Sequence, residues 1–306
     1  MKLNVQQLKV FVEVMRRETL QEAADQLGLT QPTVSFHLRK LEESLGVQLF
    51  RKQARKLIRS EAADELLPYA RRVVSLMEEA AGRMRARAEQ GHHRLRLGAS
   101  YTPATYFLPP FLAEYKRLHP DTDLLLTVKK AGTTLSLLRN HEIDAAIVSL
   151  PDEPEKGLQI VPLIEDELQL VMNPRHPLAA AGKLTVSQLE GESFLLHEQG
   201  STSRQLAEEW AAYVGLPFHS VMELGAIETI KETLKFNSGI GILPLRSVLK
   251  ETAAGELVRR PLPGEGYTNR RHICLAFRDE PIYAAHIRSF IDFIRSASGA
   301  GGSQDG

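Results

Sequence analysis

Hydrogen-bond donors and cations recur along residues 31–45, on one side of a predicted helix. Val34, Leu38, Leu41 and Leu45 are spaced by four, three and four residues, which places them on the inward face. The other side carries groups that match the acceptors and phosphates of a DNA major groove. These residues are Gln31, Pro32, Thr33, Ser35, Phe36, Arg39 and Lys40. Among them, the aromatic ring of residue 36 packs either on a thymine methyl group or against another protein surface.

A run of basic residues follows this helix. Between residues 51 and 59 five cations occur without an acidic residue: Arg51, Lys52, Arg55, Lys56 and Arg59. The first 60 residues contain eleven Lys and Arg against six Asp and Glu, a surplus of five positive charges, although the whole chain has a formal net charge of zero. Such a cluster suits contacts to phosphates, although a solvated loop has the same composition.

Short turns rich in hydroxyl groups and glycine precede four predicted helices in the C-terminal part of the chain. The turns are Ser100-Tyr101-Thr102, Gly132-Thr133-Thr134, Gln199-Gly200-Ser201-Thr202-Ser203 and Gly225-Ala226. Backbone N–H groups and the helix dipole favour an anion at such ends, and hydroxyls add donors. Taken singly, each Ser or Thr is better explained as a helix N-cap. Four such turns at equivalent ends favour one shared anion site.

Three further residues belong beside this predicted site or near it. Ser149 lies at the end of a predicted strand, and His197 lies shortly before a glycine turn. The imidazole is equally explained as a surface histidine with ordinary partners. Arg204 is the nearest cation in sequence to the glycine turn, and it either assists the anion or points to solvent. A single negative charge requires neither Arg nor Lys, because N–H and hydroxyl donors suffice.

Other chemistry is disfavoured by what the sequence lacks. Cys274 is the single cysteine, which excludes a disulfide within one chain and a cysteine zinc cluster, and its apolar surroundings predict a buried thiol. We find no nucleophile elbow, zinc-protease pair or phosphate-binding loop, so we expect no enzyme activity and no cofactor. The neighbouring His92 and His93 are expected to be solvated at a linker rather than to bind a metal.

The first 60 residues have the pattern of a helix-turn-helix. Apolar residues at helical spacing predict two short helices, the first over residues 8–15 and the second near residues 20–27. Thr19 is placed to cap the second helix, and Gly28 is placed to end it. Thr30 is placed to cap a third helix, with Pro32 tolerated in its first turn.

A heptad pattern predicts a long helix after the basic run. Its apolar residues alternate at spacings of four and three, which predicts a seam that pairs with a second chain. The seam consists of Leu66, Ala70, Val73, Met77, Ala80, Met84 and Ala88. Packing against its own domain is the alternative, and Pro68 fits best near a helix start or a kink.

From residue 92 onward, strand and helix patterns alternate. The expected strands are 94–99, 124–128, 145–149, 192–197, 240–243 and 272–277, with helices over 111–118, 202–214, 226–236 and 281–296. Such alternation predicts mainly parallel sheets with helices on their faces. The small polar residues 297–306 are expected to form a disordered tail.

The N-terminal pattern resembles the DNA-binding signature of the LysR family of transcriptional regulators. The matching residues are Leu8, Phe11, Ala23, Ala24, Leu27, Thr30-Gln31-Pro32-Thr33-Val34-Ser35, Leu38, Leu41-Glu42, Leu45-Gly46 and Leu49-Phe50-Arg51. The resemblance implies that the helix from Gln31 enters the major groove and that residues 50–59 form a wing. Glu18-Thr19-Leu20, Phe36 and the glycine-free segment 60–63 depart from the family pattern, which affects the operator preference that we expect.

The resemblance also implies an α+β multidomain fold with a winged helix-turn-helix, a linker helix, and an α/β two-lobed periplasmic-binding-protein-like effector domain. The expected domains are 1–60, 61–90 and 91–296. In the last of these, lobe I covers about 92–163 and 268–296, and lobe II covers about 164–267. The expected partners are a double-stranded DNA operator, a small anionic effector between the lobes and further copies of the chain, as a homodimer or homotetramer.

The effector-site residues expected on this basis come from both lobes. They are Ser100, Tyr101, Thr102, Thr133, Ser149, His197, Ser201, Thr202, Ser203 and Ala226. A secreted solute-binding protein would share this architecture, but the N-terminus lacks the apolar core of a signal peptide and the chain has no apolar run of membrane-spanning length. We therefore expect a cytoplasmic protein without a membrane partner.

Overall fold

The computed structural model describes residues 3–17, 19–53, 56–88, 93–151, 155–268, 270–279 and 284–300, apart from the side chains of residues 52, 53, 56, 79, 82–88 and 300. Contacts divide the chain into two units, Met1–His93 with Arg139–Glu142, and Arg94–Leu138 with Ile143–Gly306. The expected boundaries at residues 60 and 90 stay predictions, because the contacts group the helix-turn-helix and the linker helix together. No helix in the described part of the chain is long and apolar enough to cross a membrane.

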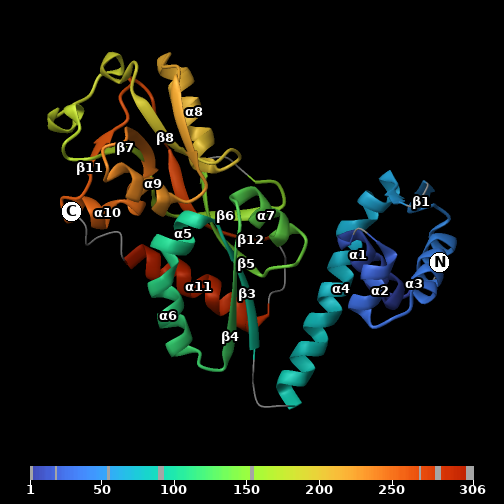
Figure 1. The fold of residues 1–306 in the computed structure, drawn as a ribbon. Coiled ribbons are helices and arrows are strands. Elements are labelled where there is room, and N and C mark those ends of the chain that lie inside the picture. The colour runs from blue at the N-terminus through green and yellow to red at the C-terminus, as the bar shows by residue number, and fades with distance from the viewer. Residues whose placement is uncertain are drawn as a thin grey trace. The chain divides into compact units, whose positions relative to one another are not determined.

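Three helices and a hairpin form the head of the first unit (Figure 1). They are α1 (Val5–Arg16), α2 (Leu20–Leu27), α3 (Gln31–Leu45), β1 (Phe50–Gln53) and β2 (Lys56–Arg59). The Thr19 hydroxyl accepts a hydrogen bond from the Glu22 backbone N–H, and Gly28 ends α2 in the left-handed conformation with φ 63°. Thr30 occupies the N-cap position of α3 without a side-chain cap, because its hydroxyl bonds to that of Thr33 at 2.8 Å.

The linker helix α4 runs continuously over Glu61–Ala88, with Pro68 in its interior. The apolar residues of the predicted seam fall into a covered group and an exposed group along this helix. Ala70 is buried and Leu66 is half-buried against the core of the head, so these two residues pack within their own chain. Val73 and Met77 are exposed, and so is Leu76, at 65%. The exposed apolar stripe therefore keeps Val73 and Met77 of the predicted seam and adds Leu76, whereas the head covers the first two predicted positions. The side chains of Met84 and Ala88 lie outside the described residues.

The second unit contains two lobes, each built on a five-stranded sheet. The sheet of lobe I has the order β4-β3-β5-β12-β6. Its strands and helices are β3 (His93–Ala99), α5 (Tyr101–Tyr106), α6 (Leu108–Leu118), β4 (Thr122–Val128), α7 (Ala131–Arg139), β5 (Ala145–Pro151), β6 (Leu158–Glu165), β12 (Arg271–Arg278) and α11 (Ala285–Ala300). Residues 297–300 therefore continue α11 instead of beginning a tail, with the Ser298 hydroxyl bonded to the Ile294 carbonyl. Residues 301–306 lie outside the described part.

The sheet of lobe II has the order β11-β7-β10-β8-β9. Its elements are β7 (Leu168–Met172), β8 (Ser193–His197), α8 (Thr202–Val214), β9 (Ser220–Leu224), α9 (Ile227–Leu234), β10 (Ile240–Pro244), α10 (Leu249–Ala253) and β11 (Val258–Pro261), with 3-10 turns at Pro177–Ala180, Val186–Leu189 and Leu245–Ser247. The chain crosses between the lobes twice, from β6 to β7 and from β11 to β12.

These crossings explain why the sheets are mixed rather than mainly parallel. Strands joined by helices within a lobe pair in parallel, as β3 does with β5 and β8 does with β9 and β10. The strand β12 returns from lobe II and lies between β5 and β6, antiparallel to both. In lobe II, β7 pairs antiparallel with β10 and β11. The expectation of mainly parallel sheets was wrong because it did not include strands that enter from the other lobe.

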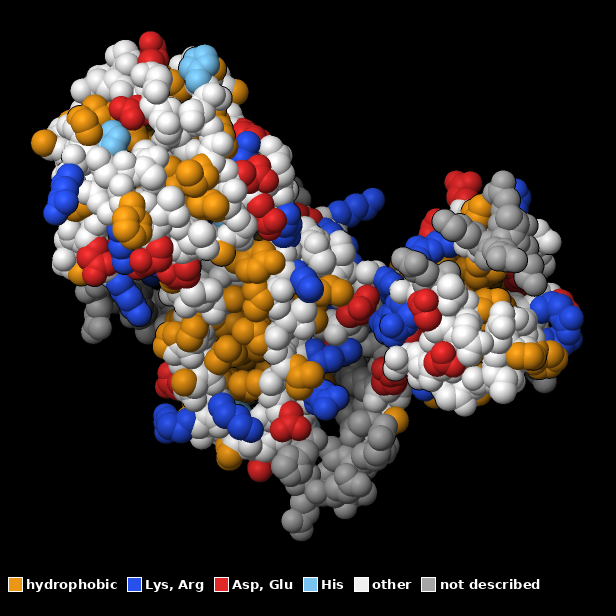
Figure 2. Space-filling model, in the orientation of Figure 1, with side chains coloured by type: hydrophobic (Ala, Val, Ile, Leu, Met, Phe, Trp, Pro, Cys, Tyr) orange, Lys and Arg blue, Asp and Glu red, His pale blue; other side chains and the backbone are white. Residues whose placement is uncertain are grey.

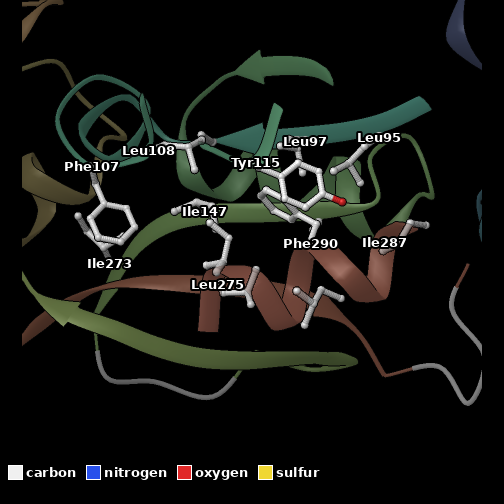
Figure 3. Packing of buried hydrophobic residues seen from close by; sticks show 14 of the residues in the cluster. Leu95, Leu97, Phe107, Leu108, Tyr115, Ile147, Ile273, Leu275, Ile287 and Phe290 are labelled. Carbon is white, nitrogen blue, oxygen red and sulfur yellow. The ribbon is translucent and has the colours of Figure 1, made fainter. Parts of the chain in front are cut away.

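Helices cover both faces of the sheet in lobe I. Figure 3 shows the core on the face of α6 and α11, where Leu97, Ile147, Tyr115 and Phe290 pack together. Burying one such side chain contributes about 1.5–3 kcal/mol. A second hydrophobic cluster joins residues of α7 to other residues of the sheet. It contains Cys274, which is 3% exposed. The sheet is thereby fixed, together with the strand ends that carry the predicted site.

Some apolar side chains of lobe I remain on the surface. Figure 2 shows hydrophobic side chains gathered on one face of this lobe. The exposed large hydrophobic residues of α6 and β4 are Leu118, Leu125 and Leu126. The strand β4 lies at an edge of its sheet. An apolar edge strand is a surface on which another chain can pack.

Candidate functional site

The predicted recognition helix presents its polar side outward. Val34, Leu38 and Leu41 of α3 are buried in the head. Gln31, Pro32, Ser35, Phe36, Arg39 and Lys40 are exposed, and Thr33 is half-buried. The Phe36 ring is 48% exposed and packs edge-on against His37, with ring centroids 5.8 Å apart. An exposed aromatic ring beside cationic side chains is available for contact with a base or with another protein.

The wing is anchored to the recognition helix by a carboxylate. Glu42 Oε1 accepts hydrogen bonds from the backbone N–H groups of Leu49 at 2.7 Å and Phe50 at 3.1 Å. Arg59 donates to the Met15 carbonyl at 2.8 Å, so this cation also fastens the wing to the head. Arg51 is exposed. Arg55 and the side chains of Lys52 and Lys56 lie outside the described residues.

A cavity of about 30 Å³ lies where the two lobes of the second unit meet. It is lined by Ser100, Tyr101, Thr102, Lys130, Ala131, Ser149, His197, Ser201, Thr202, Ser203, Ile227 and Arg271. Eight of these residues were expected from the sequence. They come from the strand ends of β3, β5 and β8 and from the starts of α5 and α8. The lobes meet so closely that the cavity has room for about two water molecules.

Two of the predicted effector residues, Thr133 and Ala226, do not line this cavity. Thr133 is exposed because α7 begins two residues earlier, at Ala131, and the helical turn carries it away. Ala226 is the N-cap of α9, and the next residue, Ile227, lines the cavity instead. At both helix starts a neighbouring residue lines the cavity instead of the expected one, namely Ala131 and Ile227.

Hydroxyl groups hold the lobes and strand ends in place. Ser100 Oγ accepts from the Ser149 backbone N–H at 2.9 Å, which joins the end of β3 to that of β5. Ser201 Oγ accepts from the Arg204 backbone N–H at 3.2 Å and caps α8. Thr202 Oγ1 donates to the Ser149 carbonyl at 3.3 Å, across the boundary between lobes. The N-cap interpretation thus applies to Ser201, whereas Ser100 occupies the N-cap position of α5 without a side-chain cap bond and joins two strands instead.

Arg271 is the most buried cation of the cavity, and it was not among the residues expected from the sequence. It is 2% exposed at the start of β12. Its guanidinium donates to Ser203 Oγ of lobe II and to Thr102 Oγ1 of lobe I, each at 3.2 Å, and lies 3.5 Å from the carboxylate of the fully buried Asp166. Burial lowers the pKa of Arg271, and Asp166 opposes this shift. The guanidinium thus joins both lobes in a dry environment.

A second cation, Lys130, lies at the edge of the cavity. Lys130 Nζ donates to the Gln199 carbonyl at 2.8 Å and lies 3.2 Å from the Glu198 carboxylate of lobe II. Lys130 also lies between β4 and α7, directly before the first residue of α7. Arg204, by contrast, does not line the cavity: its side chain is buried and bonds to Glu208 at 2.6 Å and Glu223 at 3.2 Å. Arg204 therefore neither lines the cavity nor points to solvent, and the cations that line the cavity are Lys130 and Arg271.

Three buried polar atoms of the cavity residues have no hydrogen-bond partner among the described residues. They are Ser149 Oγ, His197 Nδ1 and Arg271 Nε. Burial lowers the pKa of His197, while Glu198 raises it to a lesser extent, so the imidazole is neutral near pH 7. Leaving a buried donor or acceptor unpaired costs about 1–3 kcal/mol, and such groups gather at binding sites. All three belong to residues that line the cavity, which is consistent with a site for a polar ligand.

A metal site has no support in the described ranges, where no cluster of three metal-binding side chains occurs. Of the two linker histidines considered from the sequence, His92 lies outside these ranges and His93 begins β3.

Comparisons with known proteins agree with both parts of the chain. Residues 5–64 match the family model described as "Bacterial regulatory helix-turn-helix protein, lysR family", and residues 88–299 match "LysR substrate binding domain". The regulator CfxR of Cupriavidus necator is 33% identical over 83% of this chain and 80% of its own length. The regulator CbbR of Rhodospirillum rubrum is 29% identical over 96% of this chain and 97% of its own length.

Solved structures show the same fold. A full-length OxyR variant from Pseudomonas aeruginosa superposes with a TM-score of 0.69 at 24% identity, covering 97% of this chain and 95% of that one. Full-length CbnR in complex with its target DNA gives a TM-score of 0.62 at 20% identity, covering 96% of this chain and 100% of that one. The relatives are transcriptional regulators rather than enzymes. This chain belongs to the LysR family of DNA-binding transcriptional regulators and carries the family's effector-binding domain.

Proposed function

We propose that this regulator is switched by a small anion, a carboxylate or another oxyanion, bound in the cavity between the two lobes. The observation that carries the proposal is the buried Arg271, which reaches both lobes and shares the cavity with polar atoms that lack partners among the described residues. The Asp166 carboxylate at 3.5 Å already balances the charge of this guanidinium, so Arg271 would offer the anion directed N–H donors rather than a free positive charge.

The helices around the cavity add to this preference. Ala131 and Ile227 are the first residues of α7 and α9, and Thr202 is the first residue of α8. All three line the cavity, so the positive ends of three helix dipoles meet there. The proposed effector contacts are Ser100, Tyr101, Thr102, Ser149, His197, Ser201, Thr202, Ser203, Lys130 and Arg271.

For DNA we propose that α3 enters the major groove. Gln31, Pro32, Thr33, Ser35, Phe36, Arg39 and Lys40 would face the bases and nearby phosphates, and Arg51, Lys52, Arg55 and Lys56 of the wing would contact the backbone. The support is the exposed polar side of α3 and its fixed position next to the wing through Glu42. Base contacts would set sequence preference, and wing contacts would set affinity and register. We propose that the regulator acts in the cytoplasm, where it would meet its operator.

We further propose a homodimer, or a homotetramer built from dimers, with α4 as one interface. Tyr69, Val73, Leu76 and Met77 leave an exposed apolar stripe on this helix, and the edge strand β4 offers a second apolar surface. Two heads would then bind an inverted-repeat operator. Val73→Asp with Leu76→Asp should abolish dimers and operator binding together, as measured by sedimentation and gel shift. Undiminished dimers would place the interface elsewhere.

The anion would act by stabilising one arrangement of the lobes over another, since a ligand shifts an equilibrium only through unequal affinity for two states. The test is calorimetry of the full-length protein against inorganic phosphate and small dicarboxylates, with ethylammonium as the cationic control. Two further probes are 2-PG, which is bound in a solved regulatory domain of Synechocystis CcmR, and shikimate, which is bound in the solved effector binding domain of QuiR. Nuclease protection on genomic fragments then identifies the operator and any change that a binder causes. Binding only by the cation would contradict the proposal.

A further inference from the structure

A second group of polar residues joins the lobes outside the cavity. Tyr106 belongs to α5 of lobe I, whereas Glu228 and Lys231 belong to α9 and Glu251 to α10 of lobe II. The Tyr106 hydroxyl donates to Glu228 Oε1 at 2.6 Å. Lys231 Nζ lies 2.8 Å from Glu251 Oε1, 2.9 Å from Glu228 Oε2 and 5.0 Å from the centre of the Tyr106 ring. None of these four side chains lines the cavity.

The chemistry of this group makes the Tyr106 hydrogen bond a charge-assisted one. The Lys231 and Glu251 side chains are 3% and 14% exposed, so water screens this pair poorly, whereas the Glu228 side chain is 57% exposed and its bonds are partly screened. Burial raises the pKa of Glu228, but hydrogen bonds from Tyr106 and Lys231 lower it more, so the carboxylate is charged. Burial and Glu228 raise the pKa of Tyr106, so its hydroxyl keeps its proton and donates it. A hydrogen bond to a charged acceptor is about twice as strong as a neutral one.

The position of this bond couples it to the cavity. Tyr106 lies on the same short helix as Tyr101 and Thr102, which line the cavity. Glu228 directly follows Ile227, which lines the cavity from lobe II. The cavity holds about two water molecules, so an oxyanion larger than that has room inside it only if the walls, which include the starts of α5 and α9, move apart. The Tyr106–Glu228 bond spans these two helices and opposes that movement.

We propose that the hydrogen bond from Tyr106 to Glu228 is a latch that stabilises the narrow cavity against a wider one, and so sets the affinity for the effector. The proposal rests on the proposed anion site in the cavity. Losing the latch raises the population of the wider, binding-competent arrangement, and the apparent affinity rises with that population. The latch is thus a determinant of effector response outside the effector contacts.

The test compares Tyr106→Phe with Tyr213→Phe in the full-length protein. Tyr106→Phe keeps the ring over Lys231 and removes only the hydroxyl. Tyr213 is the matched control, because its hydroxyl donates to the Glu265 carbonyl within lobe II. Amide hydrogen exchange without added ligand should speed up about tenfold in α5 and the first turn of α9 in Tyr106→Phe only, the loss expected for a hydrogen bond to a charged group. Unchanged exchange there would overturn the latch.

A double-mutant cycle with Glu228→Gln identifies the bond itself. If the two residues act through one hydrogen bond, the double variant exchanges no faster than the faster single variant. Additive acceleration would overturn the assignment. Calorimetry with inorganic phosphate separates this proposal from the anion site: tighter phosphate binding by Tyr106→Phe supports both, and weaker binding overturns the latch. Absence of binding by phosphate and dicarboxylates in every variant, together with faster exchange, supports the latch and contradicts the anion site.

Discussion

The two recognition surfaces of this protein are built in opposite ways. The proposed DNA-reading residues occupy one stretch of α3 and are mostly exposed, so they contribute little to the core of the head. The proposed effector cavity collects mostly buried side chains from strand ends, helix starts and the returning strand β12. In the first unit a substitution can therefore change recognition without changing stability. In the second unit the side chains that line the cavity also hold the lobes together.

Replacing Arg271 is the strongest way to test this difference. Arg271→Met leaves the carboxylate of Asp166, which is fully buried, without its cation. Breaking a buried ion pair from one side costs about 3–5 kcal/mol. We expect this loss in the free energy of unfolding of the full-length protein, measured by urea denaturation, together with loss of anion binding.

The double variant Arg271→Met with Asp166→Asn is the control for Arg271→Met. It removes both charges and keeps the oxygen that accepts from the Arg246 backbone N–H. Most of the lost stability should return, but anion binding should not. If the double variant bound anions normally, Arg271 would be a purely structural residue.

The DNA-reading residues lie on one helix, whereas the cavity is built from distant segments. This difference explains which site residues could be predicted from the sequence. The turns at residues 100–102 and 199–203 were identified because hydroxyls next to a helix start form a local pattern. Arg271 was missed because it lies far along the chain from every other residue of the cavity. No local feature marks it, since the adjacent Arg270 has the same type. Lys130 follows a strand and resembles a solvated lysine until lobe II is placed opposite it.

The seam of α4 and the directions of the strands show the same limit of prediction from local sequence. Heptad spacing correctly indicated an apolar stripe, but Ala70 is covered by the head, which periodicity within one helix cannot show. The alternation of strands and helices indicated two α/β lobes, yet the antiparallel β12 depends on where the chain returns after lobe II. Local patterns thus predicted the helices and strands, whereas contacts between distant segments decided which side chains are buried and in which direction the strands pair.

Substitutions on α3 should change recognition without changing stability. Phe36→Ala or Arg39→Ala should lower discrimination between the operator and random DNA by about 1–3 kcal/mol. The free energy of unfolding should change by less than about 0.5 kcal/mol, because the Phe36 ring is half exposed. Gel shifts with both DNAs check this prediction.

Arg51→Ala is the matched contrast, because a wing cation should contact phosphate. It should weaken binding to all sequences alike and reduce the salt slope by about one. An unchanged specificity ratio in Phe36→Ala would assign this ring to a protein contact.

Lowering the pH should destabilise the second unit through His197. We expect this to be the smallest of the predicted effects. Burial lowers the pKa of His197 below its ordinary value of 6.5. At a pH between 6.5 and this lowered pKa, the unfolded chain binds a proton at His197 and the folded chain does not. Unfolding therefore becomes easier as the pH falls. The contribution is fully present above pH 6.5 and is lost as pH falls through the lowered pKa. His197→Gln should flatten this dependence in urea denaturation over a pH series from neutral to mildly acidic, and an unchanged slope would contradict the buried neutral imidazole.

The most direct test of the central claim uses Ser149. Its hydroxyl has no hydrogen-bond partner among the described residues, whereas its backbone bonds to Ser100 and Thr202 survive substitution by alanine. Ser247→Ala is the control, because that hydroxyl donates to the Pro244 carbonyl outside the cavity. The measurement is operator affinity as a function of the concentration of the anion that binds in calorimetry. We expect wild type and Ser247→Ala to respond, and Ser149→Ala to bind the operator equally well but to need at least several-fold more anion. An identical response of Ser149→Ala and wild type would contradict an effector held in this cavity.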